Sequence, residues 1–471
     1  MTEEKPAEIT EEFLRDFQKI GKNGNPYEIL DGRIAEYITQ EYLTLIVLNG
    51  IPYIYRRGSY IKDEDGKILK AHIKTLIWPE LVTAGRINRV YQLILMDYRL
   101  HKTNDDVNKY PPHWINFRNG MYDPILQEMH EHKKEYYSIN QIPHGYNPEA
   151  EFSGSVADQF LCGLLPDAED REMFLRYAGY CMTRDTSIQK FFVIVGLPGS
   201  GKSTLINMLV EMIGKENISC ITLQDLNERF TPTELLGKLL NTCADLPKKA
   251  LEQVDMIKRI TGEDQIKGEY KGGKIFRFNS YAKLFFSANE MPASLDEKSD
   301  AFYRRILMAE VLKKGPRIQS LRKGLRESMP GFIKECVAAL TRLYLSGGEI
   351  DSPNSRRLVH EYHRESDSVQ SFIDDKIQRA PGEKIDRSEL YRVYQTYCLL
   401  NEWAYLGNRS FYSNMRGKGY RDYGSCGKRY IRDISLKRAV TGAETALNRA
   451  LTDQFRPATP EEKAVFSGKN S

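Results

Sequence analysis

The sequence predicts an α/β protein built around a mostly parallel β-sheet. Between residues 191 and 311, short apolar segments alternate with segments of helical periodicity, as expected when helices cover both faces of a parallel sheet. A glycine-rich segment of the form G-x-x-x-x-G-K-S separates the first apolar segment from the helix that follows it. A block rich in Lys and Arg lies near the C-terminal end. We therefore expect a central α/β domain with a smaller domain on each side.

The central block contains five expected strands and two expected helices. The helices are predicted over residues 202–213 and 251–261. The strands are predicted over residues 191–196, 218–223, 239–245, 283–289 and 306–311.

The 471 residues are enough for about three domains. We expect a flexible arm over 1–25, a small mixed α/β domain over 26–150 and a helical collar for oligomerisation over 151–188. The central domain is expected over 189–347. It is followed by a helical connector over 348–380, a small C-terminal domain over 381–455 and a disordered tail over 456–471. Hairpin turns are expected at Asp65-Gly66 and Asn119-Gly120. Asp63 and its acidic neighbours are interpreted as part of a solvated hairpin and not as a metal site.

Composition excludes several classes of protein. There is no run of 18 apolar residues and no apolar stretch at the start, so neither a membrane span nor a secretion signal is expected, and we predict a location in the cytoplasm of a bacterial host cell. The seven cysteines are scattered, without a CxxC pair, and are expected to be reduced thiols. Net charge is only +4, but residues 384–438 carry 12 Lys or Arg against 5 Asp or Glu, which gives +7 there and −3 elsewhere. Such a positive region indicates a polyanionic partner.

The glycine-rich segment has the residue types needed to hold a nucleotide triphosphate. Its glycines allow backbone N–H groups to surround phosphate oxygens, and the following helix directs its positive end to the same place. Lys202 is predicted to reach the β- and γ-phosphates, and the Ser203 hydroxyl to ligate Mg²⁺. The expected cofactors are therefore ATP and Mg²⁺. The predicted binding residues are Gly196, Leu197, Pro198, Gly199, Ser200, Gly201, Lys202, Ser203 and Thr204.

Downstream polar residues suggest how the nucleotide would be hydrolysed. Asp245 ends an apolar strand, where a carboxylate can bind Mg²⁺ and orient the attacking water. Asn289 ends another buried strand and is predicted to sense the γ-phosphate. Arg304 and Arg305 precede the last strand, and either could stabilise transition-state charge in a neighbouring subunit.

Two basic segments are candidate DNA contacts. A hairpin expected around Gly272-Gly273 would crowd Lys267, Lys271 and Lys274 near its tip, which suits a pore that follows a phosphate backbone, although an ordinary solvated hairpin has the same composition.

The C-terminal block reads as a helix, a short helix with Ser410 as N-cap, and a hairpin turning at 424–427, which is typical of a winged helix. Its predicted groove contacts are Ser413, Asn414 and Arg416, and its predicted phosphate contacts are Arg421, Lys428 and Arg429. A protein-binding or capping domain is the alternative.

The order of these motifs resembles the superfamily-three helicases, a compact AAA+ branch, and more narrowly the phage and plasmid primase-helicase family with its Rep-like helicase-initiators. The resemblance is carried by the phosphate loop, Asp245, Asn289 and the segments INFRNGMYDP, FLRYAGYCMT, ITGEDQIKGEYKG, AFYRRIL and ESDSVQSFI. It implies a homo-hexameric ring with ATP between subunits, arginines acting in trans, and translocation on single-stranded DNA. It also implies contacts with double-stranded DNA at a replication origin and with replisome proteins, and no membrane.

The sequence departs from that family in two respects. Many members have two adjacent acids where this chain has Ala244-Asp245, so Asp245 serves both roles or Glu263 or Asp264 contributes. Only about 120 residues precede Asn119, and we expect no primase activity. The alternative functions are an origin-binding initiator without processive unwinding and a P-loop phosphotransferase.

Overall fold

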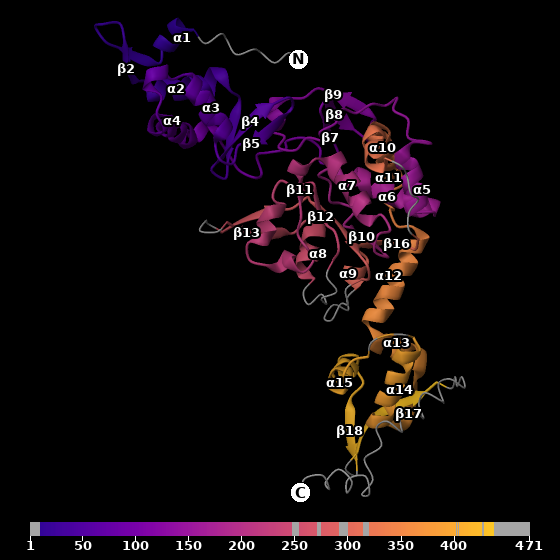
Figure 1. The fold of residues 1–471 in the computed structure, drawn as a ribbon. Coiled ribbons are helices and arrows are strands. Elements are labelled where there is room, and N and C mark those ends of the chain that lie inside the picture. The colour runs from indigo at the N-terminus through magenta and orange to yellow at the C-terminus, as the bar shows by residue number, and fades with distance from the viewer. Residues whose placement is uncertain are drawn as a thin grey trace, which may run out of the picture. The chain divides into compact units, whose positions relative to one another are not determined.

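The computed structural model describes residues 10–246, 254–270, 275–291, 300–313, 320–401, 403, 405–425 and 428–437. The chain divides into two compact units, one of Met1–Pro292 with Arg304–Arg356 and one of Ala293–Tyr303 with Arg357–Ser471 (Figure 1). The tail expected over 456–471 lies outside the described residues. Part of the arm expected over 1–25 is ordered, since it contains helix α1 (Glu11–Arg15) and strand β1 (Gln18–Ile20), which pairs with β2 (Pro26–Ile29).

A five-stranded parallel sheet forms the centre of the first unit. Its spatial order is β11 (Ile218–Ser219), β12 (Leu240–Cys243), β15 (Lys283–Ala288), β10 (Phe191–Gly196) and β16 (Ile306–Val311). All four neighbouring pairs are parallel. The predicted mixed α/β class is therefore confirmed.

The second predicted strand is shorter than expected. It was predicted over 218–223, but β11 ends at Ser219. Beyond that point the side-chain amide of Asn241 takes the place of the strand's backbone partner: its Oδ1 accepts from the Ile221 N–H at 2.9 Å and its Nδ2 donates to the Ile221 carbonyl at 2.9 Å. Apolar periodicity does not reveal such a side-chain substitution.

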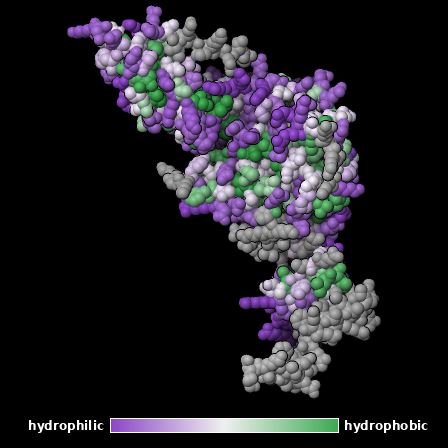
Figure 2. Space-filling view, viewed as in Figure 1, coloured by the Kyte–Doolittle hydropathy of each residue, from purple (hydrophilic) through white to green (hydrophobic). Residues whose placement is uncertain are grey.

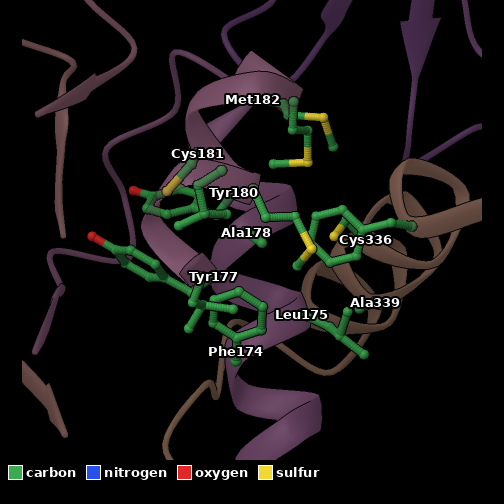
Figure 3. Packing of buried hydrophobic residues seen from close by; sticks show 14 of the residues in the cluster. Phe174, Leu175, Tyr177, Ala178, Tyr180, Cys181, Met182, Cys336 and Ala339 are labelled. Carbon is green, nitrogen blue, oxygen red and sulfur yellow. The ribbon is translucent and has the colours of Figure 1, made fainter. Parts of the chain in front are cut away.

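Helices of the first unit pack against the sheet through one large core. They are α5 (Val156–Leu164), α6 (Ala168–Cys181), α7 (Lys202–Ile213), α10 (Leu321–Glu327) and α11 (Met329–Leu345). Helix α8 (Asp255–Thr261) also belongs to this unit. Helix α6 belongs to the segment expected to form a collar, but it contributes many residues to the central core (Figure 3). The Phe174 and Tyr177 rings lie 6.1 and 5.4 Å from that of Phe192 in β10.

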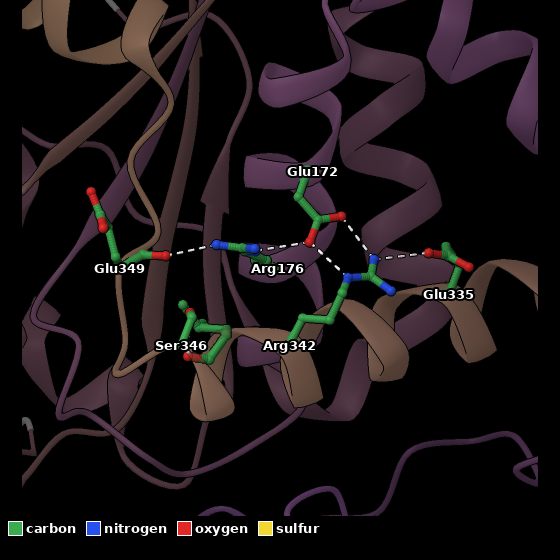
Figure 4. A network of polar contacts seen from close by, with 7 residues as sticks. Glu172, Arg176, Glu335, Arg342, Ser346 and Glu349 are labelled. Atoms are coloured by element: carbon green, nitrogen blue, oxygen red, sulfur yellow. Dashed lines mark hydrogen bonds and ion pairs between the residues drawn. The ribbon is translucent and has the colours of Figure 1, made fainter.

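The α6–α11 contact has a close centre and a charged rim. A Cβ added at Gly179 would lie 2.3 Å from the Cys336 carbonyl oxygen, so the helix backbones approach closely only because this residue is glycine. At the rim, Arg342 donates to both carboxylate oxygens of Glu172 at 2.9 and 2.8 Å and to Glu335 at 3.0 Å (Figure 4). This contact fixes α6 and α11 beside the sheet.

The N-terminal part of the first unit has a four-stranded sheet with order β5-β4-β3-β6. The strands are β3 (Leu45–Leu48), β4 (Ile51–Arg56), β5 (Ser59–Lys62) and β6 (His101–Lys102), and the accompanying helices are α2 (Asp31–Tyr37), α3 (Lys67–Thr75) and α4 (Ala84–Met96).

The hairpin predicted at Asp65-Gly66 was wrong. The turn between β4 and β5 is at Arg57-Gly58, where both residues have positive φ (47° and 94°), as a two-residue hairpin turn requires. Gly66 is instead the N-cap of α3. Asp63 is buried and its carboxylate accepts hydrogen bonds from the N–H groups of Ile68 and Leu69, so it starts this helix and is not part of a solvated hairpin.

A three-stranded meander connects this region to the central domain. It comprises β7 (Ile115–Phe117), β8 (Gly120–Asp123) and β9 (Glu128–His130). The predicted hairpin is present, with its two-residue loop at Arg118-Asn119, one position earlier than expected. After the meander, Asn140 Nδ2 donates to Asn217 Oδ1 at 2.9 Å and to the Gly237 carbonyl at 2.8 Å, which ties the segment to the central domain.

Helix α12 (Pro353–Ser366) begins in the first unit and continues into the second, which also contains α9 (Asp300–Tyr303). Among its described residues, the second unit has six further main elements. They are α13 (Ser368–Lys376), β17 (Ile377–Asp386), α14 (Arg387–Leu400), α15 (Asn408–Gly417), β18 (Asp422–Ser425) and β19 (Lys428–Leu436). The three strands form an antiparallel sheet with order β17-β19-β18. The boundary expected between the connector (348–380) and the C-terminal domain (381–455) falls inside β17, where the register shifts between Arg379 and Lys384. Helix α13 belongs to the core of this unit and not to a separate connector. The predicted Ser410 N-cap was wrong, because α15 begins at Asn408 with Gly407 as its N-cap.

Hydrophilic side chains cover much of the visible face of the first unit (Figure 2). Within the described residues, no helix is both long and apolar enough to cross a membrane.

Candidate nucleotide-binding site

The predicted phosphate loop connects the carboxyl end of β10 to the amino end of α7. Gly199 and Gly201 have φ of 72° and 110°, values that a side chain disfavours. Leu197, Pro198 and Gly199 are exposed, and the backbone N–H groups at the start of α7 lie next to them. The loop therefore has the conformation and position of an anion-binding helix start.

Lys202 and Asn289 meet at this loop. Lys202 Nζ donates to the Gly196 carbonyl at 2.6 Å, to the Leu197 carbonyl at 2.9 Å and to Asn289 Oδ1 at 3.2 Å. Asn289 directly follows β15, the sheet neighbour of β10. The parallel register thus brings together two residues that are 87 positions apart.

Asp245 belongs to the same end of the sheet. It follows β12, the other neighbour of β15, and has a left-handed conformation with φ of 60°. Its N–H donates to Ser287 Oγ at 3.2 Å. Burial lowers the pKa of Lys202, and the negative charge of Asp245 opposes this shift, which places that carboxylate within electrostatic reach of the lysine.

Ser287 is a positioning residue that the sequence analysis missed. Its hydroxyl and its carbonyl accept the N–H groups of Asp245 and Leu246, and so fix the turn that carries the carboxylate. A serine inside an apolar strand was the only available signal, and it is a weak one.

The donor set fits Mg²⁺. Ser203 is exposed at the start of α7, and the Ser203 hydroxyl and Asp245 carboxylate are the hard oxygen ligands that Mg²⁺ prefers alongside phosphate and water oxygens. No group of three or more His, Cys, Asp or Glu among the described residues could hold a metal by itself, so substrate phosphates would have to complete the coordination. Ser200 is buried with no hydrogen-bond partner for its hydroxyl among the described groups, so one polar group of the loop lacks a protein ligand.

The two arginines lie at the amino end of the parallel strands, opposite the end that carries the phosphate loop. Both precede β16, which runs parallel to β10, so the six residues of the strand separate them from the phosphate loop by ~20 Å. Arg304 is exposed. Arg305 is buried and its Nε donates to Thr261 Oγ1 at 3.0 Å. Burial lowers the pKa of Arg305, the charge of Arg304 adds to this lowering, and Asp264 opposes it.

Glu263 and Asp264 are also distant from Lys202. Asp264 interacts with Arg305, and Glu263 Oε1 accepts from Thr186 Oγ1 at 2.7 Å. Of the acids considered as the catalytic base, Asp245 is the one placed beside the phosphate loop of the same chain.

The predicted DNA contacts of the first unit lie on an antiparallel hairpin of β13 (Gln265–Glu269) and β14 (Ile275–Asn279). Lys267 is exposed and stands opposite Arg277, which is also exposed and was not predicted. Lys271 and Lys274 lie outside the described residues.

In the second unit, some of the predicted DNA contacts are exposed, and others are already bonded within the unit. Ser413, Arg421 and Arg429 are exposed. The Asn414 amide donates to the Ser410 carbonyl, and Arg416 forms an ion pair with Asp422 at 3.1 Å. The Lys428 side chain lies outside the described part of the chain.

Two protein families match parts of the chain. Residues 55–166 match a family described as D5 N terminal like, and residues 194–305 match DUF5906, a family of unknown function. The second match extends from the strand before the phosphate loop to Arg305.

A curated viral protein is also similar. The chain is 24% identical over 285 residues to a protein of Acanthamoeba polyphaga mimivirus named Putative helicase L207/L206. The alignment covers 55% of this chain and 28% of the viral protein, so the chain spans little more than a quarter of that relative.

Among solved structures, apo forms of the NrS-1 C-terminal region (305–718) are similar. They have 12% and 13% identity and TM-scores of 0.46 and 0.47, and each comparison covers 85% of this chain and 98% of that region. A likeness this weak carries no argument about the fold or the function.

Proposed function

We propose that this protein is an ATP-dependent DNA helicase that translocates on single-stranded DNA during replication of a phage or another mobile element. A distant relative named as a helicase and the D5 match support a replication role of the primase-helicase type. The finer elements of the proposal are ATP and Mg²⁺ as ligands, a P-loop AAA+ core, a hexameric ring, and a C-terminal winged helix that binds DNA.

The observation that carries the proposal is the meeting of Lys202, Asp245 and Asn289 at one end of the parallel sheet. These residues come from three different sequence motifs: Asn289 accepts a hydrogen bond from Lys202, and Asp245 lies within electrostatic reach of that lysine. A lysine, a carboxylate and an amide around a glycine-rich helix start form an arrangement suited to hydrolysis of a nucleoside triphosphate.

Each group has a distinct part in the proposed reaction. Lys202 would exchange its bonds with the Gly196 and Leu197 carbonyls for bonds with phosphate oxygens. Asp245 would accept the proton of the attacking water, and Asn289 would hold that water and the γ-phosphate in position. Bound Mg²⁺, held by Ser203 and Asp245, would neutralise charge on the phosphates.

The position of the arginines supports a multi-subunit enzyme. An arginine ~20 Å from its own phosphate loop cannot stabilise the transition state there. Exposed Arg304 could do so for a neighbouring subunit, whereas Arg305 is engaged with Thr261 in its own chain. We therefore propose Arg304 as the residue that acts in trans.

Forked DNA provides the test. Purified protein should hydrolyse ATP faster with single-stranded DNA, displace a strand from a fork, and have the native mass of a hexamer when ATP is bound. Lys202→Ala should abolish hydrolysis and unwinding while the protein stays folded. Full hydrolysis by a monomer would contradict the shared-site arrangement, and transfer of the γ-phosphate to an acceptor other than water would indicate a phosphotransferase.

The positive charge of residues 384–438 favours a second function as an origin-binding initiator. Such a role predicts preferential binding to one DNA sequence over unrelated sequences at the same salt concentration. Sequence-specific binding without strand displacement would favour the initiator without processive unwinding.

A further inference from the structure

One face of the C-terminal sheet carries a diagonal arrangement of cations and tyrosines. Tyr423 in β18 is directly opposite Tyr430 in β19, and Lys384 in β17 is directly opposite Arg432 in β19. Directly opposed residues share a face, and so do residues two positions apart on one strand. These four residues, called the tyrosine–cation face below, therefore project from the same side of the sheet.

Each cation lies over the tyrosine diagonal to it. Lys384 Nζ is 4.6 Å from the centre of the Tyr430 ring, and the Arg432 guanidinium carbon is 3.1 Å from that of the Tyr423 ring. Both cationic side chains are exposed, while the residue between Tyr430 and Arg432, Ile431, is buried in the core on the other side. The rings thus hold two cations in fixed positions at a solvent-facing surface.

The nearest acidic side chains are engaged elsewhere. Asp386 is opposite Tyr430, but its carboxylate accepts the N–H groups of Ser388 and Glu389 at the start of α14. Asp433 accepts the Gly382 N–H at 2.9 Å. Lys384 and Arg432 outnumber Asp386, the acid that shares the face, so the face keeps a net positive charge.

The predicted groove-contact helix, α15, has its arginine already paired with an acid of the same unit. Arg416 in α15 and Arg387 in α14 both bind Asp422, at 3.1 and 3.4 Å. An arginine that shares a carboxylate inside its own unit must break that ion pair before it can bind a phosphate. Positive charge is therefore more available on the sheet face than at Arg416.

We propose that the tyrosine–cation face binds the phosphate backbone of DNA, and this rests on the proposed function in DNA replication. Arg and Lys are the side chains that contact phosphates, and a cation already oriented by a ring loses less conformational freedom when it binds. An open sheet face suits an extended polymer, whereas small molecules bind in concave sites.

The test measures binding of the full chain to a labelled single-stranded oligonucleotide and to a duplex at several salt concentrations. Each lost phosphate contact reduces the slope of log K against log salt by about 0.7 for a single strand and about 0.9 for a duplex. The double variant Lys384→Ala/Arg432→Ala should lower the slope by about 1.4 for a single strand or about 1.8 for a duplex. If the variant and the wild type bind equally at 1 M salt, the variant should then bind ~25-fold or ~60-fold more weakly at 0.1 M salt. The DNA whose binding shows this slope change is the form that the face contacts.

Matched variants separate position from charge. Arg322→Ala/Lys323→Ala removes two exposed cations from α10 in the first unit and should leave DNA affinity within about twofold. Tyr423→Phe/Tyr430→Phe keeps both rings and should bind as the wild type does. Tyr423→Leu/Tyr430→Leu keeps the charge but should weaken binding several-fold. If the Ala variant melts early, Lys384→Gln/Arg432→Gln provides the same comparison.

Equal loss of affinity in the α10 control, or no loss in the Lys384/Arg432 variants, would overturn this proposal. The two failures remain distinguishable. If the wild type binds DNA and shows DNA-stimulated hydrolysis while the face variants are unaffected, only the face assignment fails. If the wild type neither binds DNA nor responds to it, the proposed function fails and the face loses its ligand as well.

Discussion

Arg304 and Arg305 offer a sharp test of where each arginine acts. Arg304 is exposed at the amino end of the parallel strands, and the six-residue strand β16 places it ~20 Å from its own phosphate loop. An arginine that stabilises phosphoryl-transfer charge contributes ~10³- to 10⁵-fold to turnover, equivalent to ~4–7 kcal/mol. Arg304→Ala should therefore reduce DNA-stimulated ATP hydrolysis by at least ~10³-fold, with nucleotide binding and the melting temperature close to wild type.

Arg305→Ala should behave differently because that side chain is buried against Thr261. Its removal leaves a cavity and an unpaired neighbour, so we expect a loss of ~1–3 kcal/mol in the free energy of unfolding. Denaturant unfolding and steady-state hydrolysis, measured for both variants, separate the two roles. A stable Arg305→Ala protein with no hydrolysis, beside an active Arg304→Ala protein, would reverse the assignment.

Mixing tests action in trans directly. Lys202→Ala and Arg304→Ala proteins are each expected to be inactive, but in a mixed ring some interfaces combine an intact Lys202 with an intact Arg304 from the neighbour. Random one-to-one mixing makes about a quarter of the interfaces complete, so about a quarter of wild-type activity should return if interfaces act independently. Co-folded mixtures with no recovered activity would refute the trans arrangement.

Three further outcomes follow from the first unit. Asn289→Ala removes the amide beside Lys202 and should reduce hydrolysis by about 10²-fold while ATP binding, measured by calorimetry, persists. Gly179→Ala inserts a Cβ 2.3 Å from the Cys336 carbonyl and should lower the free energy of unfolding by ~1–3 kcal/mol in urea titrations; an unchanged midpoint would show that the helices separate at little cost. Burial lowers the pKa of Lys283 from its usual 10.5 to about 7, so between these pH values the unfolded chain binds more protons than the folded chain. The free energy of unfolding should therefore rise with pH there, by at most about 1.4 kcal/mol per pH unit. Lys283→Met should lose that rise, and parallel pH profiles of the two proteins would contradict this.

Local signals in the sequence succeeded and failed for identifiable reasons. Asp65-Gly66 has the composition of a hairpin turn, yet Gly66 serves as a helix cap because the buried Asp63 carboxylate satisfies the first N–H groups of α3. Arg57-Gly58 forms the turn although Arg seldom adopts positive φ, because the pairing of β4 with β5 fixes the register. Ser410 has the residue type of an N-cap, but the helix begins earlier, at Asn408, with Gly407 as its N-cap. A local side-chain cap decided the conformation at Gly66, and strand pairing decided it at Arg57-Gly58.

The sequence by itself determined the α/β class, the five parallel strands and the glycine-rich loop, because apolar periodicity and glycine spacing are local properties. It also indicated Asp245 and Asn289 as candidates, since polar residues at strand ends are visible without a structure. Only the tertiary structure decided that strand order brings both to the same end of the sheet as Lys202, and that the parallel direction of β16 leaves the arginines at the opposite end of the strands. The order of strands in a sheet depends on which surfaces pack together across the whole chain, and no short segment encodes it.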